Sequence, residues 1–194
     1  MKLKEFLGSY NSMERALATP YRVKKLSIRF PADINVYADE FLKFENLTEL
    51  TIHTQLKHPP YIPGQIASVK KLRKLSVLNV PFTQLPEWVF GMSNLEYLML
   101  RGNEAPVLPP SVANLQHLKT LRIENCEITA LPPEIKMLKN LRQLSLSDTK
   151  VATLMLDDLP PNLMQLQIRK GAMDETELIK VKNFIPSLKI SVHY

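Results

Sequence analysis

Apolar residues recur along the central part of the chain at a fixed spacing of 23 residues. Copies that begin at Leu72, Leu95 and Leu118 each carry apolar residues at positions 1, 4 and 6, and each carries a Leu-Pro step at positions 14 and 15. A fourth copy opens at Leu141. Self-similarity at a fixed period of this length indicates stacked repeats, and the alternation of positions 4 and 6 with polar neighbours predicts a half-buried strand in each copy.

A later apolar pair, such as Val112 with Leu115, recurs together with the strand leucines and the Leu-Pro step. In this combination the chain resembles leucine-rich repeat proteins of the 23-residue type LxxLxLxxNxLxxLPxxIxxLxx. The resemblance implies an α/β fold, a leucine-rich repeat solenoid shaped as a curved horseshoe. It implies about eight parallel strands on the concave face, with loops and short helices on the convex face.

We expect a single domain over residues 1–194, with an N-terminal cap at 1–22, repeats at 23–170 and a C-terminal cap at 171–194. The N-terminal cap contains a predicted helix from Ser12 to Thr19, where Ser12 can accept a backbone hydrogen bond. Both caps resemble those of bacterial leucine-rich repeat proteins, so the chain is expected to be complete at both ends.

The C-terminal cap is predicted from a capping box, Asp174 with Glu177, followed by an apolar helical face. That face consists of Leu178, Val181 and Ile185. The helix is expected to stop at Pro186, and the last strand is expected to turn Ile190 and Val192 inward.

In the family, a ladder position after each strand, usually Asn with Cys or Thr tolerated, hydrogen-bonds the turn that leaves the strand. Asn103, Cys126 and Thr149 fit this position, whereas Gln55 is too long and Val80 has no donor. The resemblance therefore does not extend to the turns of the early coils. We interpret Cys126 as a buried ladder residue rather than a reactive thiol.

The first coils are longer than the later ones, with openings at Val23, Leu47 and Leu72 that lie 24 and 25 residues apart. The extra residues fall in a proline-rich surface loop, KHPPYIPG at 57–64. Neutral insertion of residues, which surface loops tolerate, explains this loop more simply than a function does, but the sequence leaves a functional role open.

The composition is that of a soluble globular protein, with 45% hydrophobic and 23% charged residues and one cysteine, which excludes an internal disulfide. No signal peptide and no membrane span is expected. The localisation is unknown: it is cytoplasmic if the N-terminus is native, and secreted or periplasmic if a leader has been removed. We expect a monomer.

No pattern of a catalytic or cofactor site stands out. Five scattered glycines form no phosphate-binding loop, and the four histidines lack metal-ligand spacing. The neighbouring carboxyl groups of Asp157 and Asp158 point apart and form no acid–base pair. We therefore expect no catalytic residue, no metal and no cofactor, and an enzyme is a remote alternative.

Residues between the strand leucines are predicted to point away from the core and to line the concave face. Their three columns hold seven Lys or Arg and two Glu, a net charge of +5, close to the +6 of the whole chain. The cations are Lys25, Arg29, Lys74, Arg101, Arg122, Arg169 and Lys189, and the anions are Glu49 and Glu124. Such a face should attract an acidic partner.

Exposed aromatic, Met and Arg residues together are typical of a protein interface, and they cluster in the middle of this face. The predicted partner-binding residues are Leu78, Tyr97, Met99, Arg101, Arg122, Glu124, Lys74 and Arg169. The alternative is that Leu78 and Met99 are isolated exposed apolar residues, which are common. We expect a non-catalytic module that binds an acidic protein. Nucleic-acid binding by the same face is the second hypothesis, disfavoured because few aromatic residues could stack on bases.

Overall fold

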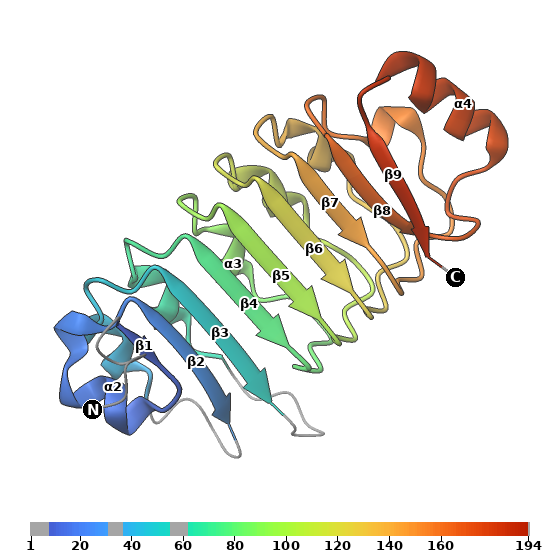
Figure 1. Cartoon of the computed structure of the whole chain (residues 1–194). Coiled ribbons are helices and arrows are strands. Elements are labelled where there is room, and N and C mark those ends of the chain that lie inside the picture. Colours follow the sequence, from blue (N-terminus) through green and yellow to red (C-terminus); the bar gives the residue numbers. More distant parts are fainter. Residues whose placement is uncertain (1–7, 31–36, 55–61, 194) are drawn as a thin grey trace.

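The computed structural model describes residues 8–30, 37–54 and 62–193, and within them the chain forms one parallel sheet of nine strands in sequence order. The strands are β1 Ser9–Tyr10, β2 Lys25–Phe30, β3 Glu49–Thr54, β4 Lys74–Leu78, β5 Tyr97–Arg101, β6 Thr120–Glu124, β7 Gln143–Leu146, β8 Gln165–Arg169 and β9 Lys189–His193. The expected solenoid of parallel strands is confirmed (Figure 1).

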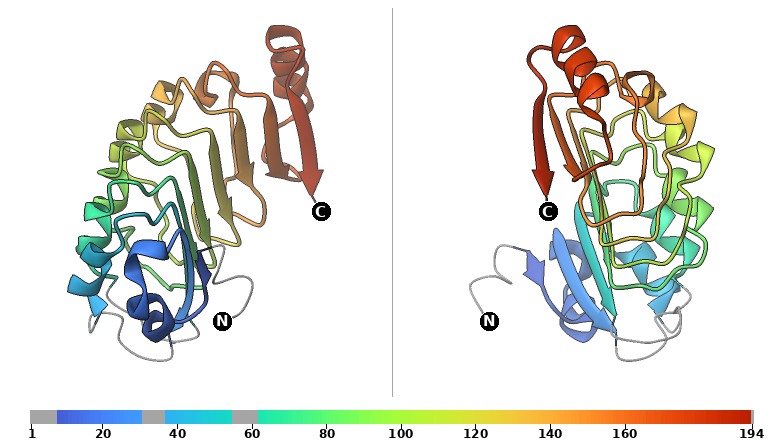
Figure 2. Two further views of the ribbon diagram at one scale, coloured as in Figure 1. Left: turned by 60° about the vertical axis from the view of Figure 1, so that its left-hand side comes forward. Right: turned by 90° about the vertical axis from the view of Figure 1, so that its right-hand side faces the viewer.

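Short helices lie on the side of the coils opposite the strands (Figure 2). They are η3 Asp39–Lys43, η4 Gly64–Ser68, α3 Glu87–Phe90, η5 Pro110–Asn114, η6 Pro133–Met137, η7 Leu156–Asp158 and α4 Glu175–Phe184. Two further helices, α2 Met13–Ala18 and η1 Pro20–Arg22, precede β2 and lie at the first edge of the sheet. The Leu-Pro steps begin several of these turns, since proline has no N–H to satisfy there. Pro109, for example, precedes η5, and its carbonyl accepts a hydrogen bond from the Val112 N–H at 3.0 Å.

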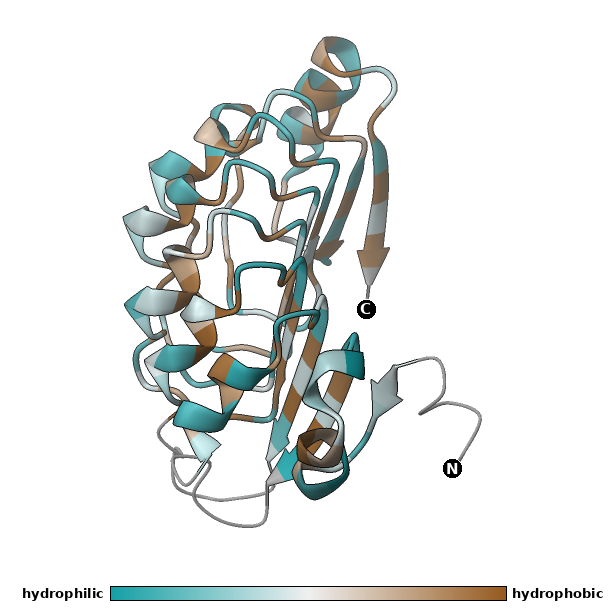
Figure 3. Cartoon of the chain, turned by 90° about the vertical axis from the view of Figure 1, so that its left-hand side faces the viewer, coloured by the Kyte–Doolittle hydropathy of each residue, from teal (hydrophilic) through white to brown (hydrophobic). Residues whose placement is uncertain are grey.

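The strand leucines align in register across the sheet and are fully buried between the strands and the helices. Leu98 pairs with Leu121, and Leu121 pairs with Leu144. The exposed fraction of all three side chains is 0%. Figure 3 shows the resulting alternation of apolar and polar residues along the strands. The alignment confirms the inward column that the 23-residue period predicted.

The ninth strand is β1, which the sequence pattern did not predict. It pairs with β2 through Ser9 with Lys25 and Tyr10 with Leu26. Gly8 precedes it in a left-handed conformation with φ of 78°, and the Gly8 carbonyl accepts hydrogen bonds from the N–H groups of Lys24 and Lys25. The expected N-terminal cap therefore contributes a strand as well as a helix, and this strand extends the sheet at its first edge.

The helix predicted at Ser12 is confirmed as α2, where the Ser12 hydroxyl accepts a hydrogen bond from the Arg15 N–H at 3.3 Å. At the other end, one half of the predicted capping box is present, because the Asp174 carboxylate accepts from the Glu177 N–H at 2.7 Å. The Glu177 carboxylate instead accepts hydrogen bonds from the N–H of Leu156 and from Lys180.

Val192 faces inward as expected, because it is aligned with the buried Ile168 of β8, but 43% of its surface is exposed. Val192 lies on β9, the last strand within the described residues, and no described coil packs beyond it. Ile190 is partly buried, and Val181 of α4 is fully buried. The helix thus covers only part of the final coil.

The ladder residues of the later coils are buried, and two of them, Cys126 and Thr149, donate to backbone carbonyls, whereas Asn103 bonds the side chain of Cys126. The Asn103 amide donates to the Cys126 sulfur at 3.0 Å, and the Thr149 hydroxyl donates to the Leu146 carbonyl at 2.9 Å. Val80 occupies the same position as a buried apolar residue, and Gln55 and most of the 57–64 loop lie outside the described residues.

A second side-chain ladder was not predicted, although its signal is a recurring Asn just before the residue that opens a coil. The side-chain amide of each Asn donates to a backbone carbonyl of the previous coil. The pairs are Asn46 to Tyr21 at 2.8 Å, Asn94 to Lys70 at 3.3 Å, Asn140 to Gln116 at 2.7 Å and Asn162 to Lys139 at 2.9 Å. This ladder ties successive coils together at the starts of the strands.

Candidate interaction surface

The outward residues of the strands form the three expected columns. The register aligns Leu78 with Arg101, and it aligns Met99 with Arg122 and Arg101 with Glu124. Six of the eight sequence-predicted residues therefore come together on the adjacent strands β4, β5 and β6. We call these the central patch, and they are Leu78, Tyr97, Met99, Arg101, Arg122 and Glu124.

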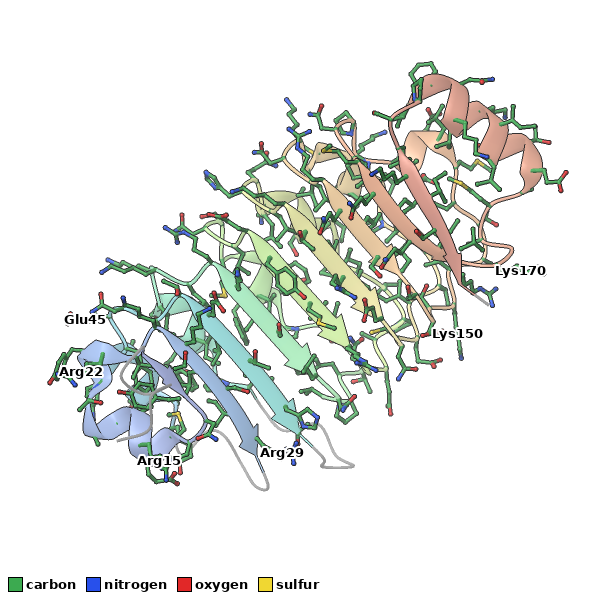
Figure 4. The ribbon with its side chains drawn as sticks, viewed as in Figure 1. Arg15, Arg22, Arg29, Glu45, Lys150 and Lys170 are labelled. Atoms are coloured by element: carbon green, nitrogen blue, oxygen red, sulfur yellow. The ribbon has the colours of Figure 1, made fainter. Side chains whose placement is uncertain are left out.

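The two other predicted residues lie at different distances from this patch. Lys74 begins β4 and pairs with Tyr97, so it borders the central patch. Arg169 ends β8, two strands beyond β6, and is not part of the cluster. The view of Figure 4 shows the side chains on this face of the sheet.

The apolar members of the central patch are half-buried and lie close together. The Tyr97 hydroxyl donates to the Met99 sulfur at 3.4 Å, which fixes these two side chains against each other on β5. Leu78 is half-buried on the neighbouring strand. Tyr97 and Met99 are thus in contact, and Leu78 lies on the adjacent strand in register with Arg101.

Two charged residues of the central patch, Arg122 and Glu124, already form an ion pair with each other. The Arg122 guanidinium donates to Glu124 Oε1 through Nε at 2.7 Å and lies 2.5 Å from it through Nη2. The same oxygen accepts a hydrogen bond from the Ser145 hydroxyl at 3.2 Å. A carboxylate placed on Arg122 by a partner would therefore have to compete with the chain's own Glu124.

A second carboxylate holds two of the predicted cations at the start of the sheet. Glu49 Oε1 lies 2.9 Å from Lys25 Nζ and 3.2 Å from Lys74 Nζ. Burial alone would raise the pKa of Glu49, but the hydrogen bonds from the two lysines outweigh it and hold the pKa below its usual value. Among the described residues, Arg101 and Arg169 have no carboxylate within ion-pair distance.

A polar pocket continues the central patch across β6, β7 and β8, and sequence reasoning missed it. Its lining residues are Thr120, Arg122, Gln143, Leu144, Ser145, Gln165 and Gln167. The Thr120 hydroxyl donates to the Gln143 amide oxygen at 3.2 Å. Amide and hydroxyl groups both donate and accept hydrogen bonds, so this pocket could pair with peptide groups of a partner.

The family profile described as a leucine-rich repeat region matches residues 22–189. The chain belongs to the leucine-rich repeat family. Leucine-rich repeat proteins are generally interaction modules, and membership assigns the chain to that general class. No curated protein matches the sequence.

Two solved leucine-rich repeat structures share the fold. The leucine-rich repeat domain of the type III effector XopL matches with a TM-score of 0.65 and 24% identity, over 94% of this chain and 72% of that one. A leucine-rich repeat protein of Leptospira interrogans matches with a TM-score of 0.60 and 20% identity, over 92% of this chain. This leucine-rich repeat chain spans 56% of the length of the Leptospira protein.

The thiol of this leucine-rich repeat chain is held in the ladder. Burial raises the pKa of Cys126, and the thiol lies 3.1 Å from the Glu124 carbonyl, to which it donates. Across the described ranges, no three His, Cys, Asp or Glu side chains gather where they could hold a metal ion. None of the helices in those ranges has the length and apolar character needed to cross a lipid bilayer.

Proposed function

We propose that this leucine-rich repeat chain is a non-catalytic module that binds an acidic segment of a protein partner on its concave sheet. The observation that carries the proposal is the central patch, where three half-buried apolar side chains adjoin two arginines on neighbouring strands. Aromatic, Met and Arg side chains in one cluster are the usual composition of an interface core. The non-catalytic part rests on the family, whose members generally bind rather than catalyse.

The two arginines of the patch favour a carboxylate-bearing partner in different ways. Arg101 is exposed at the end of β5 and is available to an acidic side chain. Arg122 is already paired with Glu124, so it would contribute only to partners that displace or share that carboxylate. Exposed cations of this kind speed the encounter with an acidic partner more than they raise affinity.

The polar pocket on β6 to β8 supports a peptide-like ligand in preference to a nucleic acid. Its amides and hydroxyls suit main-chain groups, and the patch offers a single aromatic ring, Tyr97, where single-strand binders stack several bases. Binding to a nucleic acid would also weaken steeply as salt is raised.

Replacement of Tyr97, Arg101 and Arg122 by alanine should abolish capture of the partner while leaving the melting temperature close to that of the parent. All three side chains lie at the surface of the sheet, so their loss removes contacts with the partner and leaves the buried column intact. The measurement is affinity capture from a lysate of the source organism, with the captured proteins identified by mass spectrometry.

The matched control removes one tyrosine and two cations elsewhere, namely Tyr21, Lys136 and Lys182, which are exposed. The proposal requires at least one acidic protein that the parent and the control capture and the concave variant does not. Equal capture by all three proteins would exclude the concave site.

A further inference from the structure

The residues at the starts of the strands carry a larger net positive charge than the whole chain does. The first residues of the eight repeat copies run from Val23 to Ser187, and we define the strand-start strip as the charged residues within two positions of each first residue. Its members are Arg22, Lys24, Lys25, Lys70, Lys71, Arg73, Lys74, Lys119, Lys139, Arg142 and Lys189, with Glu45, Glu49 and Glu96. Eleven cations against three anions give a net charge of +8, which exceeds the +6 of the whole chain.

These residues form a row along one edge of the solenoid because the coils are tied together there. The N–H of Thr48 donates to the Lys24 carbonyl at 2.8 Å, the N–H of Arg73 to Thr48 at 2.9 Å, and the N–H of Glu96 to Arg73 at 2.8 Å. Equivalent backbone hydrogen bonds recur at Lys119 and in each later coil as far as β9. At about 4.8 Å per strand, the row from β2 to β9 is roughly 34 Å long. In Figure 4, Arg22 and Glu45 lie at this edge, while Arg29, Lys150 and Lys170 lie at the opposite edge.

The arginines of the strip are largely committed to the chain itself. Arg73 Nη1 donates to the Lys70 carbonyl at 3.2 Å, and Arg142 Nη1 donates to the Asn162 carbonyl at 3.0 Å. The Arg22 guanidinium lies 5.9 Å from the centre of the Tyr21 ring. The internal bonds of Arg73 and Arg142 use part of the guanidinium donor capacity that bidentate binding of nucleic-acid phosphates requires.

Some lysines of the strip form ion pairs with carboxylates of the chain, and others do not. Glu96 lies 2.7 Å from Lys119 Nζ, and this hydrogen bond lowers the pKa of the Glu96 carboxyl. Lys24, Lys70 and Lys139 have no carboxylate within ion-pair distance among the described residues. These ammonium groups are single point charges on flexible stems, which suit a diffuse layer of anions.

An apolar pocket opens beside the strip on the convex side, where the coils are longest. Its lining residues are Phe41, Leu42, Phe44, Glu45, Ser68, Val69, Lys70 and Lys71. Leu42 is exposed over 54% of its surface, and Lys70 and Lys71 contribute to the same pocket. Apolar surface beside lysines is complementary to an anionic amphiphile, and a nucleic acid offers no counterpart to its apolar part.

We propose that the strand-start strip is a docking surface for an anionic phospholipid bilayer. The lysines along the edge bind the headgroup layer, and the pocket beside Lys70 and Lys71 admits apolar groups from it. The protein then lies on its edge, which leaves the concave sheet open to a protein partner. This surface does not depend on the function proposed for the concave sheet.

The test is co-sedimentation of the purified chain with vesicles of phosphatidylcholine alone or with added phosphatidylserine. The chain should bind only the vesicles that contain phosphatidylserine, and higher salt should weaken the binding. Replacement of Lys24, Lys70, Lys71 and Lys139 by glutamine should weaken it by at least about tenfold. Leu42→Ser should weaken it without changing the net charge.

The matched control replaces four lysines outside the strip by glutamine, namely Lys136, Lys150, Lys170 and Lys182, and so changes the net charge equally. It should bind nearly as well as the parent, and so should the concave variant of Tyr97, Arg101 and Arg122. Equal loss in the strip and control variants would show that net charge alone acts and would overturn the proposal. Equal binding to both kinds of vesicle, or displacement from vesicles by duplex DNA at the same salt, would also overturn it.

Discussion

Replacement of Leu121 by alanine is expected to lower the free energy of unfolding by about 2–5 kcal/mol. Leu121 lies in the middle of β6, its side chain is fully buried, and it is aligned with Leu98 on one side and Leu144 on the other. Removal of its branched end leaves a cavity between three stacked coils, which the regular backbone of the neighbouring strands cannot close by collapsing.

Urea denaturation followed by circular dichroism measures this loss. Val107→Ala serves as the control, because Val107 is exposed over 61% of its surface and should change the unfolding free energy little. If Leu121→Ala unfolds at the same urea concentration as the parent, the inward column is wrongly assigned.

Replacement of Phe41 by alanine should cost about 3–5 kcal/mol, since a larger side chain is lost from an equally buried position. Phe41 packs edge to face against Phe44, with ring centres 6.2 Å apart and an angle of 73° between the rings. The pair fills the convex side of the first coil, where the later coils have smaller apolar residues.

The neighbouring residue provides the control for this second prediction. Leu42→Ala removes an apolar side chain of similar size from the same short helix, but Leu42 is exposed over 54% of its surface. Because each coil of a solenoid contacts only its neighbours, Phe41→Ala should destabilise the first coils most and could separate their unfolding from that of the rest. Identical stability of the two variants would contradict the packing described for η3.

The sequence predicted the strands and their outward columns because both depend on spacing alone. A period of 23 residues aligns Leu98 with Leu121, and alternation within the strand then sends Met99 and Arg122 to the opposite face. No knowledge of side-chain rotamers is needed for that step. The same argument gave six residues of the central patch as neighbours.

Other features depend on information that the repeat pattern does not contain. β1 has only two residues, too few for an alternating pattern, and it is held beside β2 by the Gly8 carbonyl, which accepts hydrogen bonds from the N–H groups of Lys24 and Lys25. Val192 faces inward as the alternation of its strand predicted, but it is 43% exposed, because burial also requires a neighbouring coil and no described strand lies beyond β9. The alternation of residues along a strand predicts which way a side chain points, whereas its burial depends on which elements pack over it.

The turns that leave the strands illustrate a signal that was present and overlooked. Asn79, Gly102, Asn125 and Asp148 all follow a strand and all have positive φ. At Gly102, a Cβ atom would lie 2.5 Å from the Asn79 Oδ1 atom, so a side chain there would require Asn79 to move. Asn, Asp and Gly at equivalent positions of successive copies predict this left-handed turn.

The charges on the concave face can be counted from the sequence, but the ion pairs that they form cannot be predicted from it. The columns gave a net charge of +5, yet the bonds from Glu124 to Arg122 and from Glu49 to two lysines depend on which way long side chains turn. The polar pocket was not predicted for a related reason, since the glutamine side chains that line it on β7 and β8 carry no charge and form no recognisable motif.

Along the strands, residues of the buried column alternate with residues that face the opposite side of the sheet, in register from one coil to the next. Single cysteines placed at Leu98, Met99, Leu100 and Arg101, and labelled in the folded protein with a thiol reagent, test this alternation. The native Cys126 gives the baseline, because it is buried and its thiol pKa is raised. Fast labelling is expected at positions 99 and 101, with slow labelling at 98 and 100. Equal rates at all four positions, or the opposite alternation, would contradict it.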